Sequence, residues 1–256
     1  MVNADILRSR TISFIASERL NDWFDADTAP RLSVTYSLAI FDLDGTLADS
    51  FPWFLRVVNN VAREFNFRAV APDDVERLRG LNSLDILKSL DVPLWKLPRI
   101  AARMRALKRA QLGDIPLFHG VPEMLSALTD AGVRLSLVSS DNEANARLLL
   151  GGNAALFSDF ACGASLFGKA SKFRRIVKRA GVSPGKTIAI GDEMRDFDAA
   201  RAAGIAFGGV AWGFAAPSAL RARFRPMNGS KTWPRLREHS PLQNASDESA
   251  FQRRDR

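Results

Sequence analysis

Residues 37–50 read SLAIFDLDGTLADS, a short apolar run followed by two closely spaced acids. The run at 38–41 is typical of a strand that is buried on both faces of a sheet. Asp42 and Asp44 follow at its carboxyl end, and side chains two positions apart on extended backbone point to the same side. Gly45 then permits a sharp turn out of the sheet. We therefore expect two carboxylates that converge at the end of a buried strand.

A convergent carboxylate pair needs a neutralising partner, because like charges in one small site repel unless a cation binds or one group carries a proton. Mg²⁺ suits such a site, since it prefers oxygen ligands and keeps several of its waters. The competing interpretation is an ordinary acidic turn, because Asp-Gly pairs are common in turns. Asp-Gly alone would favour the turn, whereas the whole string favours a functional site.

The composition is that of a globular protein with one α/β domain and a modest insertion. The chain has 256 residues, of which 46% are hydrophobic and 25% are charged, and this length can bury a full core. No stretch approaches the roughly 18 uninterrupted apolar residues of a membrane span, so no membrane partner is expected. The single cysteine, Cys162, excludes an internal disulfide and favours a cytoplasmic location. We expect it to be a small buried hydrophobe.

The net charge of +8 raises the question of a nucleic-acid partner. From Pro217 to the end, nine Lys and Arg residues face four Asp and Glu residues, so this stretch carries most of the excess. The sequence lacks zinc-ligand spacing, an RNA-binding aromatic motif and a sustained basic helix face. We therefore expect no specific nucleic-acid partner, and a basic, disordered tail at 226–256.

Residues 1–35 form an extension whose apolar residues suggest one or two amphipathic helices. It lacks the apolar core and cleavage site of a secretory signal, and its acids argue against a transit peptide. Either it packs on the outside of the domain or it is poorly ordered.

Residues 51–114 are expected to form a small helical domain inserted after the first strand. Apolar residues recur at helical spacing after the first motif, and two more helical patterns run at roughly 72–90 and 93–112. Arg79 lies between predicted helices and is a candidate to meet an anionic leaving group, on position alone. A surface arginine is the alternative.

The rest of the chain alternates between strands and helices, which is the pattern of a parallel sheet. The expected strands are 133–139, 156–162, 187–191 and 205–212, and the expected helices 142–150, 171–180 and 196–203. The predicted fold class is therefore α/β: a Rossmann-like parallel sheet with helices on both faces, formed by 36–50 and 115–225, plus the helical domain.

Three later strand or helix ends carry polar residues, at the edge where parallel sheets place their ligands. Ser139 ends the second strand, and its hydroxyl with the following amide suits a phosphoryl oxygen; Ser140 is the alternative in register. Lys169 precedes a predicted helix and suits neutralisation of a phosphoryl group. Lys172 competes with it, because it falls in the first helical turn. The fourth segment, at 188–196, is an apolar strand followed by Gly-Asp and a further Asp.

Together these segments resemble the four motifs of the haloacid dehalogenase (HAD) superfamily of phosphatases. Asp42 and Asp44 match the first motif, Ser139 the second and Lys169 the third. The fourth match is residues 188–196. The helical domain resembles the cap of the phosphoglycolate-phosphatase-like subgroup, and such caps close over the site.

The resemblance implies a two-step phosphoryl transfer with Asp42 as nucleophile and Asp44 as general acid and base. Mg²⁺ would be held by Asp42, by Asp192 and by the main-chain carbonyl of Asp44. Asp196 would approach the metal through water or fix Lys169, and Glu193 is the less favoured ligand.

The implied substrate is a small phosphorylated metabolite, a phosphomonoester similar to phosphoglycolate. A phosphomutase needs the same two acids and stays open. So do a non-catalytic binding protein on this fold and, on charge alone, a nucleic-acid-associated phosphatase. The chain is expected to be a monomer or a homodimer.

Overall fold

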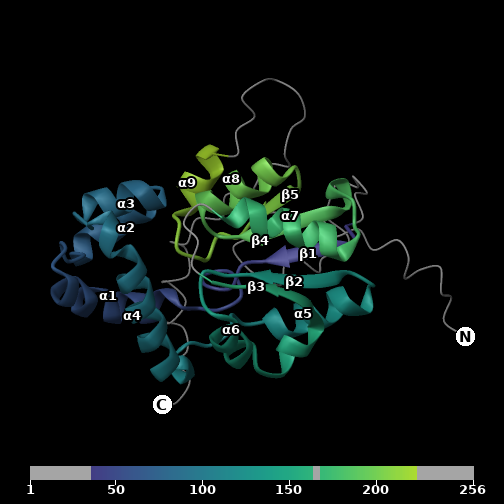
Figure 1. Cartoon of the computed structure of the whole chain (residues 1–256), viewed down its shortest axis with the longest axis horizontal. Coiled ribbons are helices and arrows are strands. Elements are labelled where there is room, and N and C mark those ends of the chain that lie inside the picture. Colours follow the sequence, from purple (N-terminus) through teal and green to yellow (C-terminus); the bar gives the residue numbers. More distant parts are fainter. Residues whose placement is uncertain (1–35, 164–167, 224–256) are drawn as a thin grey trace, which may run out of the picture.

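The computed structural model describes residues 36–163 and 168–223. Its centre is a five-stranded sheet in the order β3-β2-β1-β4-β5, in which every paired strand is parallel (Figure 1). The strands are β1 (Leu38–Phe41), β2 (Arg134–Val138), β3 (Phe157–Ala161), β4 (Thr187–Gly191) and β5 (Ala206–Gly209). The predicted α/β class is confirmed, and β1, the strand of the opening motif, lies in the middle of the sheet.

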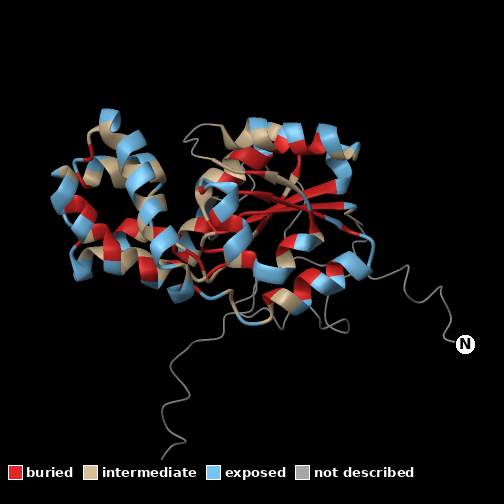
Figure 2. Ribbon diagram, turned by 60° about the horizontal axis from the view of Figure 1, so that its bottom comes forward, coloured by how far each residue is buried: buried red, intermediate tan, exposed pale blue. Residues whose placement is uncertain are grey.

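Helices cover both faces of the sheet. On one face lie α5 (Val121–Asp130) and α6 (Glu143–Leu150), and on the other α7 (Lys169–Ala180) and α8 (Met194–Ala203). Ala39 and Phe41 pack into the core under α5 and α6, whereas Leu38 and Ile40 pack under α7 and α8. This alternation follows from the two-residue period of a strand. In Figure 2 the buried residues accordingly concentrate on the strands and on the helix faces turned toward them.

Residues 51–114 form a group of helices beside the sheet, called here the helical insertion (Figure 1). Its helices are α1 (Phe51–Phe65), α2 (Val75–Arg79), α3 (Ser83–Ser89) and α4 (Leu97–Ala110), with short 3₁₀ segments at Pro72–Asp74, Leu94–Lys96 and Leu112–Asp114. It has a small apolar core of its own, built from Val58, Val70, Leu78, Leu90 and Val92. A separate core is what an independent cap would need.

Three of the differences from the sequence-based expectation concern helices α3, α7 and α9. The pattern at 72–90 is broken at Gly80, and α3 starts anew with the Asn82 side chain accepting a hydrogen bond from the Asp85 amide at 3.0 Å. Helix α7 begins at Lys169, two residues earlier than predicted. Helix α9 (Pro217–Arg223) forms after the last strand, where the sequence predicted no element, and its Leu220 is buried.

The remaining sequence-based expectations concern the two ends of the chain, membrane-spanning helices and Cys162. Residues 1–35 and the tail at 226–256 lie outside the described residues. Within 36–163 and 168–223, no helix combines the length and the apolar character that a membrane crossing requires. Cys162 is half-buried, and this burial raises the pKa of its thiol to about 11. A thiol with so high a pKa is a poor nucleophile at neutral pH.

Candidate active site

Three buried carboxylates meet at the carboxyl edge of the sheet. Oxygen atoms of Asp42, Asp192 and Asp196 lie within 4.8 Å of one another, and each residue is at most 5% exposed. Asp42 follows β1 and Asp192 follows β4, and these neighbouring strands pair in register, so their ends coincide. Asp196 comes from the first turn of α8. The fold therefore brings together three acids that are up to 154 positions apart in the chain.

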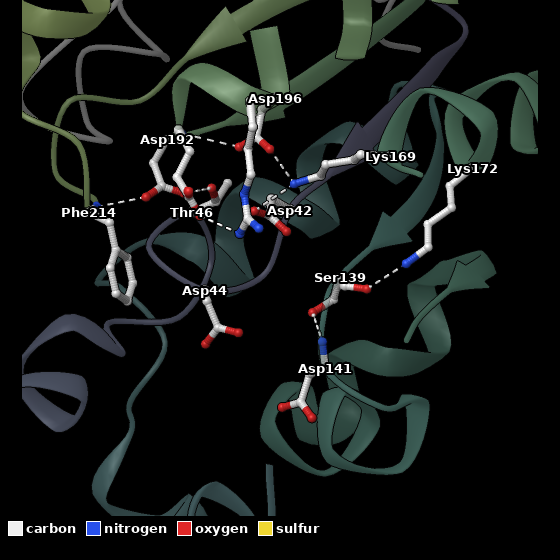
Figure 3. Close-up of polar contacts among 12 residues, drawn as sticks. Asp42, Asp44, Thr46, Ser139, Asp141, Lys169, Lys172, Asp192, Asp196 and Phe214 are labelled. Carbon is white, nitrogen blue, oxygen red and sulfur yellow. Dashed lines mark hydrogen bonds and ion pairs between the residues drawn. The ribbon is translucent and has the colours of Figure 1, made fainter. Parts of the chain in front are cut away.

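Lys169 is the ammonium group in contact with this acid cluster. Its Nζ lies 2.9 Å from Asp42 Oδ2 and also pairs with Asp196 (Figure 3). Burial alone would lower the pKa of Lys169, but the two carboxylates raise it above its ordinary value. The side chain therefore stays charged, as a group that neutralises a phosphoryl oxygen must.

Lys172, the competing lysine, serves another purpose. Its Nζ donates to the main-chain oxygens of Ser139, at 3.0 Å, and Gly163, at 2.5 Å. The argument from helix position was wrong, because Lys169 itself stands in the first turn of α7. The two lysines differ in their contacts. Lys169, the first residue of α7, contacts Asp42, and Lys172, three positions later, contacts the main chain just after β2.

Two carboxyl groups of the acid cluster, Asp42 and Asp192, have raised pKa values. Burial raises the pKa of Asp42 even though Lys169 opposes the shift. Burial also raises the pKa of Asp192 well above its ordinary value, and the neighbouring acids raise it further. A divalent cation at this point would favour the ionised carboxylates, and three carboxylate oxygens are donors that fit Mg²⁺.

Asp192 is held in a fixed orientation by two donors. Thr46 Oγ1 donates to one oxygen at 2.8 Å, and the Phe214 amide donates to the other at 2.7 Å. Gly45 has a φ of +75°, and a Cβ there would overlap the Asp192 carboxylate. Sequence reasoning missed Thr46 and Phe214. Thr46 stands inside the opening motif, but the Phe214 amide is a main-chain group and leaves no signal in the sequence.

Ser139 and Ser140 directly follow β2, the strand that pairs with β1. Ser139 is 1% exposed, and its Oγ accepts a hydrogen bond from the Asp141 amide at 3.0 Å, whereas Ser140 is exposed (Figure 3). Both serines and Lys169 line a cavity of about 450 Å³ that extends to Ser83 of the helical insertion. The structure thus places both serines, the preferred candidate and its register alternative, at one cavity wall.

Asp44 differs most from the expectation. Its carboxylate does not converge with Asp42 but lies apart from the acid cluster (Figure 3). It pairs with Lys108 of α4, whose Nζ is 2.6 Å from Oδ1 and 2.8 Å from Oδ2. The alternation of side chains holds only on extended backbone, and β1 ends at Phe41, before the turn that begins with Asp44.

Arg79 is also engaged differently from the expectation. Its guanidinium donates to the main-chain oxygens of Phe214 and Gly213, each at 3.0 Å, and to the Glu76 carboxylate at 2.7 Å. It also lies over the Phe51 ring, 5.1 Å from the centroid. Arg79 therefore joins the helical insertion to the loop after β5, and three of its nitrogens already have partners. A role in substrate binding stays a prediction.

Glu193 lies beside the acid cluster but outside the group of three. Its carboxylate accepts from the Arg195 guanidinium at 2.5 Å and from Ser83 at 3.3 Å. The positive charge of Arg195 lowers the pKa of Asp42, against the larger effect of burial. Sequence reasoning did not identify Arg195, because an arginine inside an acidic motif is expected to be solvated.

Comparison with known proteins is consistent with this geometry. Residues 39–210 match the family described as haloacid dehalogenase-like hydrolase. A phosphoglycolate phosphatase of Synechococcus elongatus is 33% identical over 181 residues, which are 68% of this chain and 84% of that protein. One from Agrobacterium fabrum is 29% identical over 189 residues, 69% and 81% of the two chains.

Solved structures show the same fold. A crystal structure described as a putative phosphoglycolate phosphatase from Lactobacillus plantarum superposes with a TM-score of 0.64 at 20% identity, covering 73% of this chain and 91% of that one. A haloacid dehalogenase-like hydrolase from Streptococcus pneumoniae gives a TM-score of 0.62 at 19% identity, covering 74% and 91%. At these identities the likeness concerns the fold alone.

Proposed function

The chain belongs to the haloacid dehalogenase-like hydrolases and is a phosphoric monoester hydrolase, and we propose that it cleaves a small phosphorylated metabolite with the help of Mg²⁺. The observation that carries this proposal is the buried contact between Asp42 and Lys169, 2.9 Å apart, inside a cluster of three carboxylates. A nucleophile, a fixed cation and a set of oxygen donors are the parts that phosphoryl transfer requires.

In the first proposed step, an oxygen of Asp42 attacks the phosphorus in line with the leaving alcohol. The bond between phosphorus and the ester oxygen breaks, its electron pair goes to that oxygen, and Asp44 supplies the proton that makes the alcohol. Lys169 stabilises the negative charge on the phosphoryl oxygens. The product of this step is an aspartyl-phosphate on Asp42.

In the second proposed step, Asp44 takes a proton from a water molecule whose oxygen attacks the same phosphorus. The bond between the phosphorus and Asp42 breaks, and its electron pair restores the carboxylate. Inorganic phosphate leaves. Asp44 has regained a proton from water in place of the one that it gave to the alcohol, so the cycle is balanced.

The metal would be held by Asp42, Asp192 and the main-chain carbonyl of Asp44, with Asp196 approaching through water. When bound, Mg²⁺ would supply positive charge to the transferring phosphoryl group. Ser139 and Ser140 line the wall of the same cavity as Lys169 and are proposed to donate hydrogen bonds to phosphoryl oxygens.

The proposed substrate is a phosphomonoester similar to phosphoglycolate, which is the substrate that the names of the relatives give. The helical insertion would act as a cap, because Ser83 lies in the wall of the cavity that Ser139 and Lys169 also line, and Arg79 connects the insertion to the loop after β5. Location in the cytoplasm and a monomeric or homodimeric state remain predictions of the same account.

Covalent trapping tests the proposed intermediate. The protein is mixed with Mg²⁺ and a phosphomonoester that it hydrolyses, and the reaction is then quenched with acid. Mass spectrometry should find a phosphoryl group on the peptide that contains Asp42. A phosphoryl group on a serine or histidine peptide would contradict the assignment. Transfer of the trapped group to a second hydroxyl of the product, in place of water, would favour the phosphomutase.

A further inference from the structure

Lys108 is a buried cation that the proposed mechanism leaves without a task. It stands in the last turn of α4, in the helical insertion, and is only 4% exposed. Lysine is almost never buried to this extent unless it is paired. Burial alone would lower the pKa of Lys108, but Asp44 and Asp141 raise it above the ordinary value. The insertion therefore places a charged lysine in direct contact with Asp44 and Asp141.

One of its partners, Asp141, is rigidly anchored. The Asp141 carboxylate accepts hydrogen bonds from the Asn142 amide, at 2.7 Å, and from the Asn145 side chain, at 3.0 Å. Its second oxygen lies 3.0 Å from Lys108 Nζ. Asp141 is 3% exposed and lies in the loop between β2 and α6, so it offers Lys108 a second buried partner besides Asp44.

The other partner, Asp44, is the group that must exchange protons with the substrate. Both of its carboxylate oxygens are bound to Lys108, at 2.6 and 2.8 Å. General acid catalysis requires one of these oxygens to lie within hydrogen-bond reach of the ester oxygen. The arrangement seen here must therefore open before Asp44 can serve the leaving group.

We propose that Lys108 recognises an anionic group on the leaving alcohol. When Lys108 binds that group, it gives up its contact with Asp44, and the Asp44 carboxylate can then reach the ester oxygen. This inference rests on the proposed phosphatase function and narrows its substrate class. The substrates favoured are phosphomonoesters whose alcohol carries a carboxylate close to the ester oxygen.

The exchange is physically reasonable because one anion replaces another. An ammonium group has three donors on a flexible stem, so Lys108 can keep Asp141 while it changes its second partner. A substrate carboxylate near the ester oxygen must come close to Asp44, since Asp44 serves that same oxygen. Among the described residues, Lys108 is the cation that contacts Asp44, so it is the group placed to offset the repulsion.

The decisive experiment compares two esters of equal length, phosphoglycolate and 2-hydroxyethyl phosphate, which lacks the carboxylate. We expect the wild-type protein to prefer phosphoglycolate in kcat/KM. Lys108→Met should lower kcat/KM for phosphoglycolate about 10- to 100-fold, as loss of a hydrogen bond to a charged group does, and should affect that for 2-hydroxyethyl phosphate much less. The ratio of the two values does not depend on the fraction of folded protein.

Two further variants separate recognition from structure. Lys108→Arg keeps the charge and should retain part of the preference. Arg103→Met removes one charge from the same helix, at an exposed ion pair with Glu64, and should leave both esters as in the wild type.

The outcomes against the inference are distinct. An equal loss for both esters in Lys108→Met would make the lysine a structural residue and overturn the inference, with the phosphatase function intact. A wild-type protein that does not distinguish the two esters would overturn it as well. If no phosphomonoester is hydrolysed under any Mg²⁺ concentration, the proposed function fails and the inference fails with it.

Discussion

Asp42 and Asp192 are held in a state that is unfavourable without a cation. Both are buried and both have pKa values raised mainly by that burial, which Lys169 partly offsets at Asp42. A protein that buries such a cluster gives up stability in order to place ligands where they are needed. The cluster therefore makes predictions about stability as well as about catalysis.

The stability of the metal-free protein should depend on pH in an unusual direction. A carboxyl whose pKa is raised in the fold binds more protons folded than unfolded, so the free energy of unfolding falls as pH rises through the raised pKa. We expect the metal-free protein to become more stable as pH is lowered from neutral toward the ordinary carboxyl range, and Mg²⁺ to stabilise it most at neutral pH. Thermal unfolding in EDTA over a pH series measures this.

Asp192→Asn is the matched variant for that measurement. It removes one ionisable group from the cluster, so its stability should change less with pH than that of the wild type and respond less to Mg²⁺. A wild-type protein whose stability rises with pH over the same interval would contradict the assignment of the raised pKa values.

Thr46 should matter for the metal without touching the substrate. Its hydroxyl fixes one oxygen of Asp192, and loss of a partner that orients a metal ligand typically lowers metal affinity 10- to 100-fold. We expect Thr46→Val to need roughly that much more Mg²⁺ for half-maximal activity, with near-wild-type kcat at saturation. In the control, Thr129→Val, the lost hydroxyl donates to a helix carbonyl, so the Mg²⁺ dependence should not change.

At the scale of single residues, the sequence predicted the members of the site better than their contacts. Asp42, Lys169, Asp192 and Asp196 were chosen from motifs, and the fold places them in contact. The direction of the Asp44 side chain and the presence of Lys108 were not foreseen. Both depend on how α4 docks against the loop after β2, and this tertiary contact has no local signature.

At the scale of elements, the junction between β4 and α8 is one of the tightly packed parts of the site. Gly191 ends β4, and a Cβ at this position would overlap the carboxylate of Asp196, the residue that pairs with Lys169. The strand and the helix can approach so closely only because this position has no side chain.

Gly191→Ala should therefore damage both stability and activity. We expect a loss of about 1–3 kcal/mol in the free energy of unfolding, the usual range for an overpacked core, together with reduced phosphatase activity. Gly185→Ala is the control, because a Cβ there meets nothing within 4 Å. Denaturant unfolding of both variants measures the difference. Equal free energies of unfolding would show that α8 moves to accommodate the added methyl group without loss of stability.

The helix boundaries that the sequence missed have local causes. The long pattern at 72–90 contains a turn at Gly80 and a cap at Asn82, which together divide it into α2 and α3. Apolar periodicity alone continues across such a break, because the two short helices bury the same side against one small core. Helix α9 was not predicted for a different reason: its seven residues are too few to show the apolar periodicity of a helix.

At the scale of the whole molecule, Arg79 and Lys108 connect the helical insertion to the sheet domain near the site, in addition to the hydrogen bond from Ser83 to Glu193. Arg79 binds the main-chain oxygens of the loop after β5, and that loop also holds Asp192 through the Phe214 amide. On the other side, Lys108 binds Asp44 and Asp141. Movement of the insertion would therefore displace Asp192, a proposed metal ligand, and Asp44, the proposed acid and base.

Arg79→Met tests the first of these contacts. We expect it to loosen the insertion and raise KM for all accepted phosphomonoesters by a similar factor, because the contact that it removes is between protein groups. Hydrogen exchange of the loop at 210–216 should become faster. A KM that rises only for esters with an anionic alcohol would instead assign substrate recognition to Arg79.

The central claim is that Asp42 is the nucleophile of a metal-dependent phosphatase. Its most direct test is the release of inorganic phosphate from a panel of small phosphomonoesters, with and without Mg²⁺, by the wild-type protein and by Asp42→Asn. The account predicts release that requires Mg²⁺ and disappears in the variant while its fold, seen by circular dichroism, is retained. Equal release by both proteins, or release that EDTA does not affect, would contradict it.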